Sequence, residues 1–212
     1  MVQGAPRRYV SRGGEKLEAA LAAFAVDTQG ARSLDAGAST GGFTDCLLRH
    51  GAAHVAAVDV GRGQLAWSLR TDSRVTVLER TNVRTLQPEA IGGAVPVAVA
   101  DLSFISLLTV APALARCTTL DAQLVLLVKP QFEAGRGAVG KGGIVRDRSV
   151  HRDVVERVAA GLADAGLPVV GLLASPITGA DGNREFLAHV RRGRAPVEAA
   201  DLAEAVESAA VT

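Results

Sequence analysis

The amino-acid sequence predicts an α/β protein with a doubly wound sheet of seven mostly parallel strands, in which the last strand is antiparallel. Apolar segments typical of buried strands alternate with amphipathic segments typical of helices. Hydrophobic residues make up 48% of the chain and aromatic residues only 3%, so Ala, Val and Leu must build the core. The last two strand-like segments are separated by only ITGADGN, which is too short for a crossover helix and indicates an antiparallel hairpin.

The first part of the chain predicts a helix followed by a β-α-β unit. The segment GEKLEAALAAFAV places Leu17, Leu21 and Phe24 on one helical face. A short strand, ARSLDAG, comes next, and GGFTDCLLRHG then predicts a helix that Gly51 closes. The segment AAHVAAVDVG predicts a second strand that ends at Asp59.

The middle of the chain repeats the alternation less regularly. RVTVLER is strand-like, PEAIGG is a short helical turn, and VPVAVADLS is a strand that ends at Asp101. LLTVAPALARC predicts a helix in which Pro112 is unfavourable, because proline removes a hydrogen bond from a helix interior. The apolar run AQLVLLVKP, stopped by Pro130, is typical of a central parallel strand that is buried on both faces.

The last third predicts a long loop, a helix, the hairpin and a final helix. The glycine-rich, cationic segment QFEAGRGAVGKGGIVRDRS is too long for a simple connection and is a candidate lid or binding loop. VHRDVVERVAAGLADAG is the next helix, PVVGLLASP and REFLAHVRR are the two hairpin strands, and residues 196 to about 210 form an amphipathic helix.

Composition limits the cellular setting and the domain organisation. The net charge is +1, so nucleic-acid binding would have to come from a local cationic patch. The two cysteines, Cys46 and Cys117, form no C-x-x-C pair, which fits reduced thiols in a cytoplasmic protein, and no apolar run has membrane-spanning length. We expect residues 1–10 to be a linker remnant that follows an upstream module, and residues 11–212 to be one domain.

The segment SLDAGASTGGFTD predicts a nucleoside-binding loop between the first strand and its helix. A glycine-rich loop in a β-α-β unit, with Asp59 ending the second strand to bind ribose hydroxyls, is how such folds hold a nucleoside. Asp35 would repel a pyrophosphate but attract a cationic centre, which favours S-adenosylmethionine over NAD as cofactor. The alternative is a plain turn in which Gly37, Gly41 and Gly42 serve helix–strand packing.

Five motifs, YVSRGGEKL, LDAGASTGGFTD, ADLSFIS, LLVKPQFE and GNREF, together resemble the methyltransferase domain of the TlyA family. That family is similar to the FtsJ-type ribose 2′-O-methyltransferases and also carries the historical name haemolysin. The resemblance runs from about Arg7 to Arg192 and implies a Rossmann-like methyltransferase fold. Family members also have a small N-terminal RNA-binding domain that resembles ribosomal protein four of the small subunit, and only its trailing linker, RRYV, is matched here.

The resemblance implies a catalytic tetrad of Lys16, Asp101, Lys129 and Glu185. Independently of the family, Asp101 and Lys129 end parallel strands and an antiparallel last strand would bring Glu185 to the same edge of the sheet. Lys129 is the expected central group, as general base or as a cation that stabilises the developing oxyanion, with the other three residues positioning it and the ribose. The alternative makes Lys129 and Glu185 an ordinary surface salt bridge.

The remaining site predictions concern the cofactor and RNA. The expected cofactor-binding residues are Asp35, Gly37, Ser39, Thr40, Gly41, Gly42, Phe43, Asp59, Val60, Asn82 and Asp101. The expected RNA-binding residues are Arg7, Arg8, Arg12, Arg136 and Lys141, since backbone phosphates bind such cations. The four histidines share no ligand spacing, so no metal site is predicted.

Together these features predict a cytoplasmic methyltransferase that uses S-adenosylmethionine to modify the ribose 2′-oxygen of ribosomal RNA. Within the resembled family the target is a cytidine, and the expected partners are ribosomal RNA or ribosomal subunits. Two alternatives remain: a methyltransferase of another acceptor, and a membrane-active haemolysin. The second conflicts with the lack of an apolar span or a strong cationic amphipathic helix in the sequence.

Overall fold

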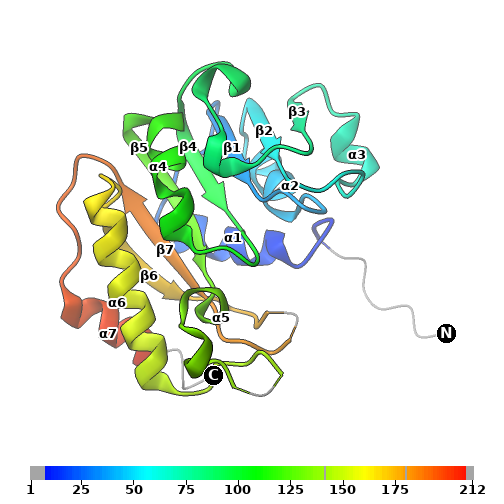
Figure 1. Cartoon of the computed structure of the whole chain (residues 1–212). Coiled ribbons are helices and arrows are strands. Elements are labelled where there is room, and N and C mark those ends of the chain that lie inside the picture. Colours follow the sequence, from blue (N-terminus) through cyan, green and yellow to red (C-terminus); the bar gives the residue numbers. More distant parts are fainter. Residues whose placement is uncertain (1–7, 141, 180, 209–212) are drawn as a thin grey trace.

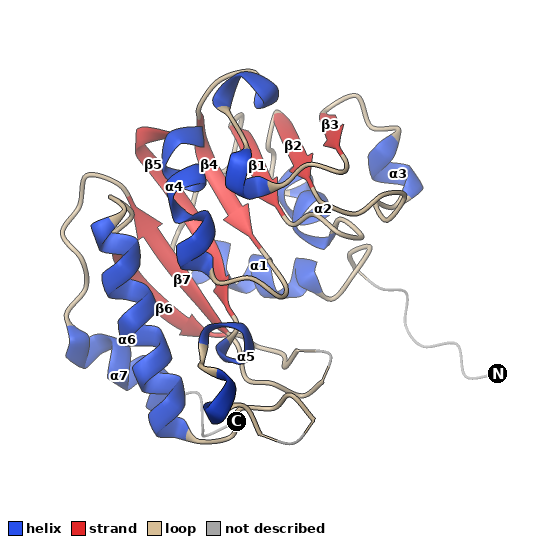
Figure 2. Cartoon of the chain, in the orientation of Figure 1, coloured by secondary structure: helices blue, strands red, loops and turns tan. Residues whose placement is uncertain are grey.

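Seven strands form one sheet in the order β3-β2-β1-β4-β5-β7-β6 in the computed structural model, which describes residues 8–140, 142–179 and 181–208 (Figures 1 and 2). β7 runs antiparallel to both of its neighbours, whereas all pairings among the first five strands are parallel. The predicted doubly wound sheet with an antiparallel last strand is therefore confirmed. The strands are β1 Arg32–Ala36, β2 His54–Val58, β3 Val75–Leu78, β4 Val95–Ala100, β5 Thr118–Val128, β6 Val169–Ala174 and β7 Phe186–Arg191.

Helices cover both faces of the sheet, with α1 and α2 on one face and α4 and α6 on the other (Figure 1). α7 packs against α6 and β6. The α-helices are α1 Gly13–Ala23, α2 Gly42–Arg49, α3 Trp67–Arg70, α4 Leu107–Cys117, α5 Pro130–Glu133, α6 Arg148–Asp164 and α7 Ala199–Ser208. Three short 3-10 helices are η1 Val83–Thr85, η2 Pro88–Ile91 and η3 Arg136–Ala138.

Two hydrophobic cores lie on opposite faces of the sheet because successive side chains of a strand point in opposite directions. In β5, Leu127 packs with Leu17 of α1 in one core, whereas Leu126 packs with Leu114 of α4 in the other. All four side chains are almost completely buried. Continuous apolar strands are therefore needed at the centre of the sheet, as the sequence predicted.

Three local features differ from the sequence prediction or extend it. β5 begins at Thr118, several residues before the expected apolar run. Pro130 stops that strand and also starts the short helix α5 inside the expected loop, since proline suits the first position of a helix. Pro112 lies within α4 without ending it, on an exposed position of the helix.

The start of the described chain packs against the domain. Tyr9 is 3% exposed and joins the core of α1 and α2, and the Val10 backbone N–H donates to Asp45 at 2.9 Å. Both residues fall in the segment 1–10 that the sequence assigned to a linker, while residues 1–7 lie outside the described part of the chain. The boundary at residue 10 stays a prediction.

Candidate active site

Three of the four predicted catalytic residues follow or precede neighbouring strands at one edge of the sheet. Asp101 comes directly after β4, Lys129 directly after β5, and Glu185 directly before β7. β7 is antiparallel to β5, with Val128 opposite Phe186, so the start of β7 lies beside the end of β5. Lys16 reaches the same place from α1, and all four side chains line one cavity of about 300 Å³.

The four charged groups form two ion pairs. Lys16 Nζ lies 2.5 Å from Glu185 Oε2, and Lys129 Nζ lies 2.5 Å from Asp101 Oδ1. Lys129 Nζ also donates to Ser103 Oγ at 3.1 Å. The side chains of Lys16 and Glu185 are 8% and 3% exposed, whereas those of Lys129 and Asp101 are 11% and 26% exposed. The second pair is thus the more accessible to a substrate.

A second cavity, of about 420 Å³, adjoins the first and contains most of the predicted cofactor residues that face solvent. Gly37, Ser39 and Asp101 line both cavities, so the two spaces meet at these residues. The residues of the prediction that line the second cavity are Gly37, Ser39, Asp59, Val60, Asn82 and Asp101. A ligand in the second cavity could therefore present a group directly to the paired lysines and acids.

The glycine loop after β1 has little room for side chains. Gly37 has φ of +90°, and a Cβ atom there would lie 2.6 Å from the carbonyl oxygen of Asp101. The backbone N–H groups of Gly37 and Ala38 both donate to the Val58 carbonyl, at 2.8 and 3.1 Å. A residue with a side chain would push the loop away from Asp101, so glycine is required where the two cavities meet.

Asp59 holds the glycine loop in place and also lines the second cavity. Its Oδ2 accepts from the Ser39 N–H at 2.8 Å, and its Oδ1 accepts from the Gly61 N–H at 2.7 Å. Each carboxylate oxygen can accept a second hydrogen bond. The same carboxylate can therefore bind ribose hydroxyls while it orders the loop.

Asp35 lies behind the loop rather than at its mouth. Its side chain is completely buried, lines neither cavity, and accepts a hydrogen bond from Thr44 Oγ1 at 2.6 Å. Burial raises the pKa of Asp35 to about 7, although the Thr44 hydroxyl opposes the shift. The sequence suggested that Asp35 contacts a cofactor cation directly, but the Asp35 side chain does not face either cavity.

The other loop residues divide between the two cavities. We call the first cavity the catalytic cavity and the second the cofactor cavity, after the predicted residues that line them. Thr40, Gly42 and Phe43 line the catalytic cavity and not the cofactor cavity. Gly41 lines neither of the two and, with φ of +98°, precedes the first turn of α2. The loop therefore forms the wall between the two spaces.

The predicted RNA-binding residues are described only in part. Arg12 is exposed and lines the catalytic cavity, while Arg8 pairs with Glu18 at 2.6 Å on the surface. Arg136 begins η3, but its side chain lies outside the described structure, as do Arg7 and Lys141. Of this set, only Arg12 is seen beside the catalytic groups.

Sequence reasoning missed two residues of the ADLSFIS motif. Ser103 accepts the hydrogen bond from Lys129, and Phe104 is 90% exposed with φ of +63°. Phe104 also packs against Phe132, with ring centroids 4.9 Å apart. Both lie in a loop, where a serine or phenylalanine has no periodic pattern to mark it; the available signal was their place directly after a strand-ending acid.

Within the described ranges, no group of three or more His, Cys, Asp or Glu side chains is arranged to hold a metal ion. A search of the same residues for a helix of the length and apolarity that a membrane crossing requires found none. Cys46 and Cys117 are both buried free thiols.

Comparisons with known proteins identify the family of the chain. The model of the FtsJ-like methyltransferase family matches residues 9–192. The chain is 58% identical over 191 residues to the 16S/23S rRNA (cytidine-2′-O)-methyltransferase TlyA of Mycobacterium tuberculosis, covering 90% of this chain and 71% of that protein. It is 46% identical to Hemolysin A of Brachyspira hyodysenteriae, covering 86% of this chain and 76% of the relative.

A solved structure shows the same fold at high similarity. A Streptococcus thermophilus protein with a provisional hemolysin name superposes with a TM-score of 0.93 and 48% sequence identity, over 98% of this chain and 76% of that one. The sequence resemblance to the TlyA family is thereby confirmed. The chain belongs to the FtsJ-like methyltransferase family, in its TlyA-like branch.

Proposed function

We propose that this enzyme transfers a methyl group from S-adenosylmethionine to the ribose 2′-oxygen of a cytidine in ribosomal RNA. The observation that carries the proposal is the cavity that gathers Lys16, Asp101, Lys129 and Glu185 and meets a cofactor-sized cavity at Gly37. The relative from Mycobacterium tuberculosis, named for cytidine 2′-O-methylation of 16S and 23S rRNA, supports the choice of acceptor. Ribosomal RNA would be met in the cytoplasm.

The second cavity fits S-adenosylmethionine. Asp59 offers carboxylate oxygens for the ribose hydroxyls, and Asn82, whose Oδ1 accepts from the Arg84 N–H at 3.0 Å, keeps its amide N–H₂ for an adenine edge. Leu102, Ile105 and Val110 supply an apolar wall. The sulfonium centre of the cofactor supplies an activated methyl group. The close approach of Gly37 to Asp101 fits a loop that brings the cofactor next to the acceptor.

Lys129 is the residue that we assign to the ribose 2′-hydroxyl. Its Nζ contacts both Asp101 and Ser103, which holds it beside Asp101, a residue that lines both cavities. From there it can take the hydroxyl proton or stabilise the negative charge that develops on the oxygen. A hydroxyl is a poor nucleophile, so either role would accelerate transfer.

Lys16 and Glu185 form the rear wall of the catalytic cavity. Both are almost fully buried, so their pairing gives a fixed arrangement of charges rather than a mobile surface contact. We assign them the task of orienting the ribose and shaping the electrostatic field around its 2′-oxygen. Arg12, exposed at the rim, is placed to bind a neighbouring phosphate.

The test is methyl transfer from tritiated S-adenosylmethionine to ribosomal subunits and to naked ribosomal RNA. The wild type should label RNA, and digestion to nucleosides should yield 2′-O-methylcytidine. Lys129→Ala should lose at least about 100-fold in rate, a typical contribution of a positioned acid–base group. Arg194→Ala, at an exposed site after β7, is the control that should keep full activity.

Lys129→Arg separates the two roles of Lys129. Arginine keeps the positive charge but does not give up its proton, so a general base would be lost whereas a stabilising cation would be partly retained. Absence of label in every RNA, together with erythrocyte lysis that Lys129→Ala retains, would contradict the proposed function and favour the haemolysin alternative.

A further inference from the structure

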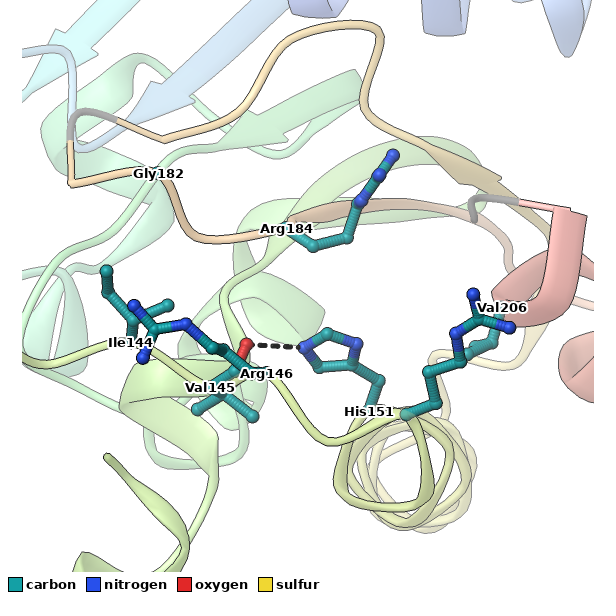
Figure 3. A pocket seen from close by; sticks show the side chains of 8 residues that line it. Ile144, Val145, Arg146, His151, Gly182, Arg184 and Val206 are labelled. Atoms are coloured by element: carbon teal, nitrogen blue, oxygen red, sulfur yellow. Dashed lines mark hydrogen bonds between the residues drawn. The ribbon is translucent and has the colours of Figure 1, made fainter. Parts of the chain in front are cut away.

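A third cavity lies beside α6, on the face of the sheet opposite α1 (Figure 1). Its volume is about 320 Å³, and Arg146, Arg148 and Arg184 line it together with His151 (Figure 3). We call it the arginine cavity. No Asp or Glu is among its lining residues in the described part of the chain. A concave site with several guanidinium groups and no lining carboxylate suits an anion.

Two of the three guanidinium groups are available to a ligand. Within the described residues, Arg146 and Arg184 make no side-chain hydrogen bond or ion pair. Arg148 pairs with Glu207 at 3.6 Å, and Glu207 binds Arg152 more closely, at 2.6 Å. The nearby carboxylate of Asp147 is used as the N-cap of α6, where it accepts from the Ser149 N–H at 2.8 Å. Within the described residues, the guanidinium groups of Arg146 and Arg184 therefore have no carboxylate in direct contact.

The wall of the arginine cavity is held in a defined shape. Asn183, 1% exposed, accepts from the Val145 N–H and donates to the Gly143 carbonyl, both at 3.0 Å. His151 is 7% exposed, and its Nε2–H donates to the Val145 carbonyl at 3.0 Å, the contact drawn in Figure 3. These bonds tie the glycine-rich loop to the hairpin tip and to α6. Such a wall does not have to be ordered at the moment of binding.

His151 also lines the arginine cavity, and its imidazole is harder to protonate than an exposed one. Burial lowers the pKa of the His151 imidazole, and the Arg184 guanidinium lowers it further, whereas the Val145 carbonyl opposes the shift. Its ring packs edge-on against Phe186 at 5.7 Å between centroids. The positive charge that an anion would meet therefore comes mainly from the arginines.

The arginine cavity is linked to the catalytic cavity through two consecutive residues. Arg184 lines the former and Glu185 lines the latter, since neighbouring side chains of extended chain point to opposite faces. Figure 3 shows Arg184 on the segment that leads into β7, with its side chain extending away from His151. A strand of RNA that passes over this segment could occupy both cavities at once.

We propose that the arginine cavity binds a backbone phosphate of the RNA strand that continues from the target nucleotide. The inference rests on the proposed function, because it takes RNA as the substrate of the catalytic cavity. The shared chemistry is a phosphate group, which could also arrive as a free anion. Arg146 and Arg184 are its main ligands, and Arg148 completes the positive rim.

The experiment measures the affinity of the full chain for a fluorescein-labelled single-stranded RNA by anisotropy, at several salt concentrations. Arg146→Gln/Arg184→Gln should bind about tenfold more weakly, as expected when a charge-assisted contact is lost. The slope of log K against log salt should fall in magnitude by about 0.7 for each phosphate contact removed. Arg191→Gln is the matched control, since this exposed arginine lies at the opposite end of the strand that Arg184 precedes.

Further measurements distinguish a lost phosphate contact from a loss of structure. In methylation assays the double variant should raise KM for RNA and leave kcat unchanged, which a general loss of structure would not do. Arg146→Gln alone alters an exposed side chain and provides the same test if the double variant folds poorly. Arg184→Lys in place of Arg184→Gln should retain part of the affinity, because lysine keeps the charge but not the planar guanidinium.

The contrary outcomes are distinct. Unchanged RNA affinity and salt slope in the double variant would overturn the inference while leaving the proposed function intact. Calorimetric binding of inorganic phosphate that the double variant loses, with unchanged RNA affinity, would also overturn it and identify a free anion as the occupant. A wild type that binds RNA through these arginines but methylates no RNA would instead contradict the proposed function.

Discussion

Asp35 shows how one buried acid changes the balance of charge beneath the active site. Its carboxyl group is completely enclosed, and among the described side chains only the Thr44 hydroxyl donates to it. Asp101 and Asp59 add negative charge nearby and contribute to raising the pKa of Asp35. The protonated carboxyl group of Asp35 therefore persists to a higher pH than that of an exposed aspartate.

The folded protein should lose stability as pH rises, relative to an Asp35→Asn variant. The pKa of Asp35 is raised from 3.8 to about 7 on folding, so its contribution is full below the unfolded value and is lost as pH rises through about 7. The loss between about pH 5 and about pH 8 is on the order of 3 kcal/mol. Denaturant unfolding of both proteins at the two pH values measures it. Parallel pH profiles would contradict the assignment.

Single residues of the site were predictable where a pattern marks them. Asp101 and Lys129 were identified through the resemblance to the TlyA family, and their places directly after apolar strands supported that choice, because the carboxyl ends of parallel strands meet at one edge of the sheet. Ser103 and Phe104 were not, since their importance depends on the path of a loop after β4. Arg184 was missed because its sequence context shows only one cation beside an acid, and the cavity exists only in three dimensions.

At the level of elements, α5 stabilises the start of α4. Glu133 of α5 accepts from the Leu107 N–H at 2.7 Å and from Ser106 Oγ at 2.6 Å, while Ser106 Oγ itself accepts from the Leu108 N–H at 3.1 Å. The first turn of a helix has unsatisfied N–H groups and favours negative charge. A carboxylate from a distant segment thus completes the cap that the local sequence begins.

Glu133→Ala should lower the free energy of unfolding by about 1 to 3 kcal/mol, since it removes an accepting group from a helix start. Glu133→Gln should lose less because it retains one acceptor oxygen. Asp153→Ala, on an exposed position of α6, is the control and should change stability little. Chemical denaturation measures all three variants, and equal losses for Glu133→Ala and Asp153→Ala would refute the capping role.

The order of elements was readable from the sequence, but their boundaries were less so. The hairpin of β6 and β7 followed from the short ITGADGN connection, which leaves no room for a crossover. The helix α5 was hidden inside a glycine-rich cationic loop, because four residues are too few to show a helical period. The cap by Glu133 depends on a contact between segments 26 residues apart, which no local pattern reveals.

Across the whole molecule, a buried ion pair joins the first helix to the residue directly before the last strand. Lys16 and Glu185 are separated by 169 positions in the sequence. Removing one partner of a buried pair leaves an uncompensated charge, whereas replacing both with apolar residues avoids that penalty. The pair can therefore be tested for stability and for catalysis separately.

Lys16→Met should lower the free energy of unfolding by about 3 to 5 kcal/mol, and Lys16→Met/Glu185→Leu should recover most of that loss. Neither variant should transfer methyl groups, since each lacks at least one of the four charged groups that line the catalytic cavity. Arg152→Met, which breaks an exposed pair with Glu207, should cost at most about 1 kcal/mol. An active double variant would show that the pair has only a structural role.

The placement of β7 between β5 and β6 has a consequence for the growing polypeptide. The walls of the cofactor cavity all come from residues between Gly37 and Val110, whereas the catalytic cavity is incomplete until Glu185 has been added. A nascent or prematurely terminated chain could thus contain every residue of the cofactor walls and still lack the machinery for transfer. Methylation would therefore begin only after β7, the last strand in the sequence, has been translated and has inserted between β5 and β6.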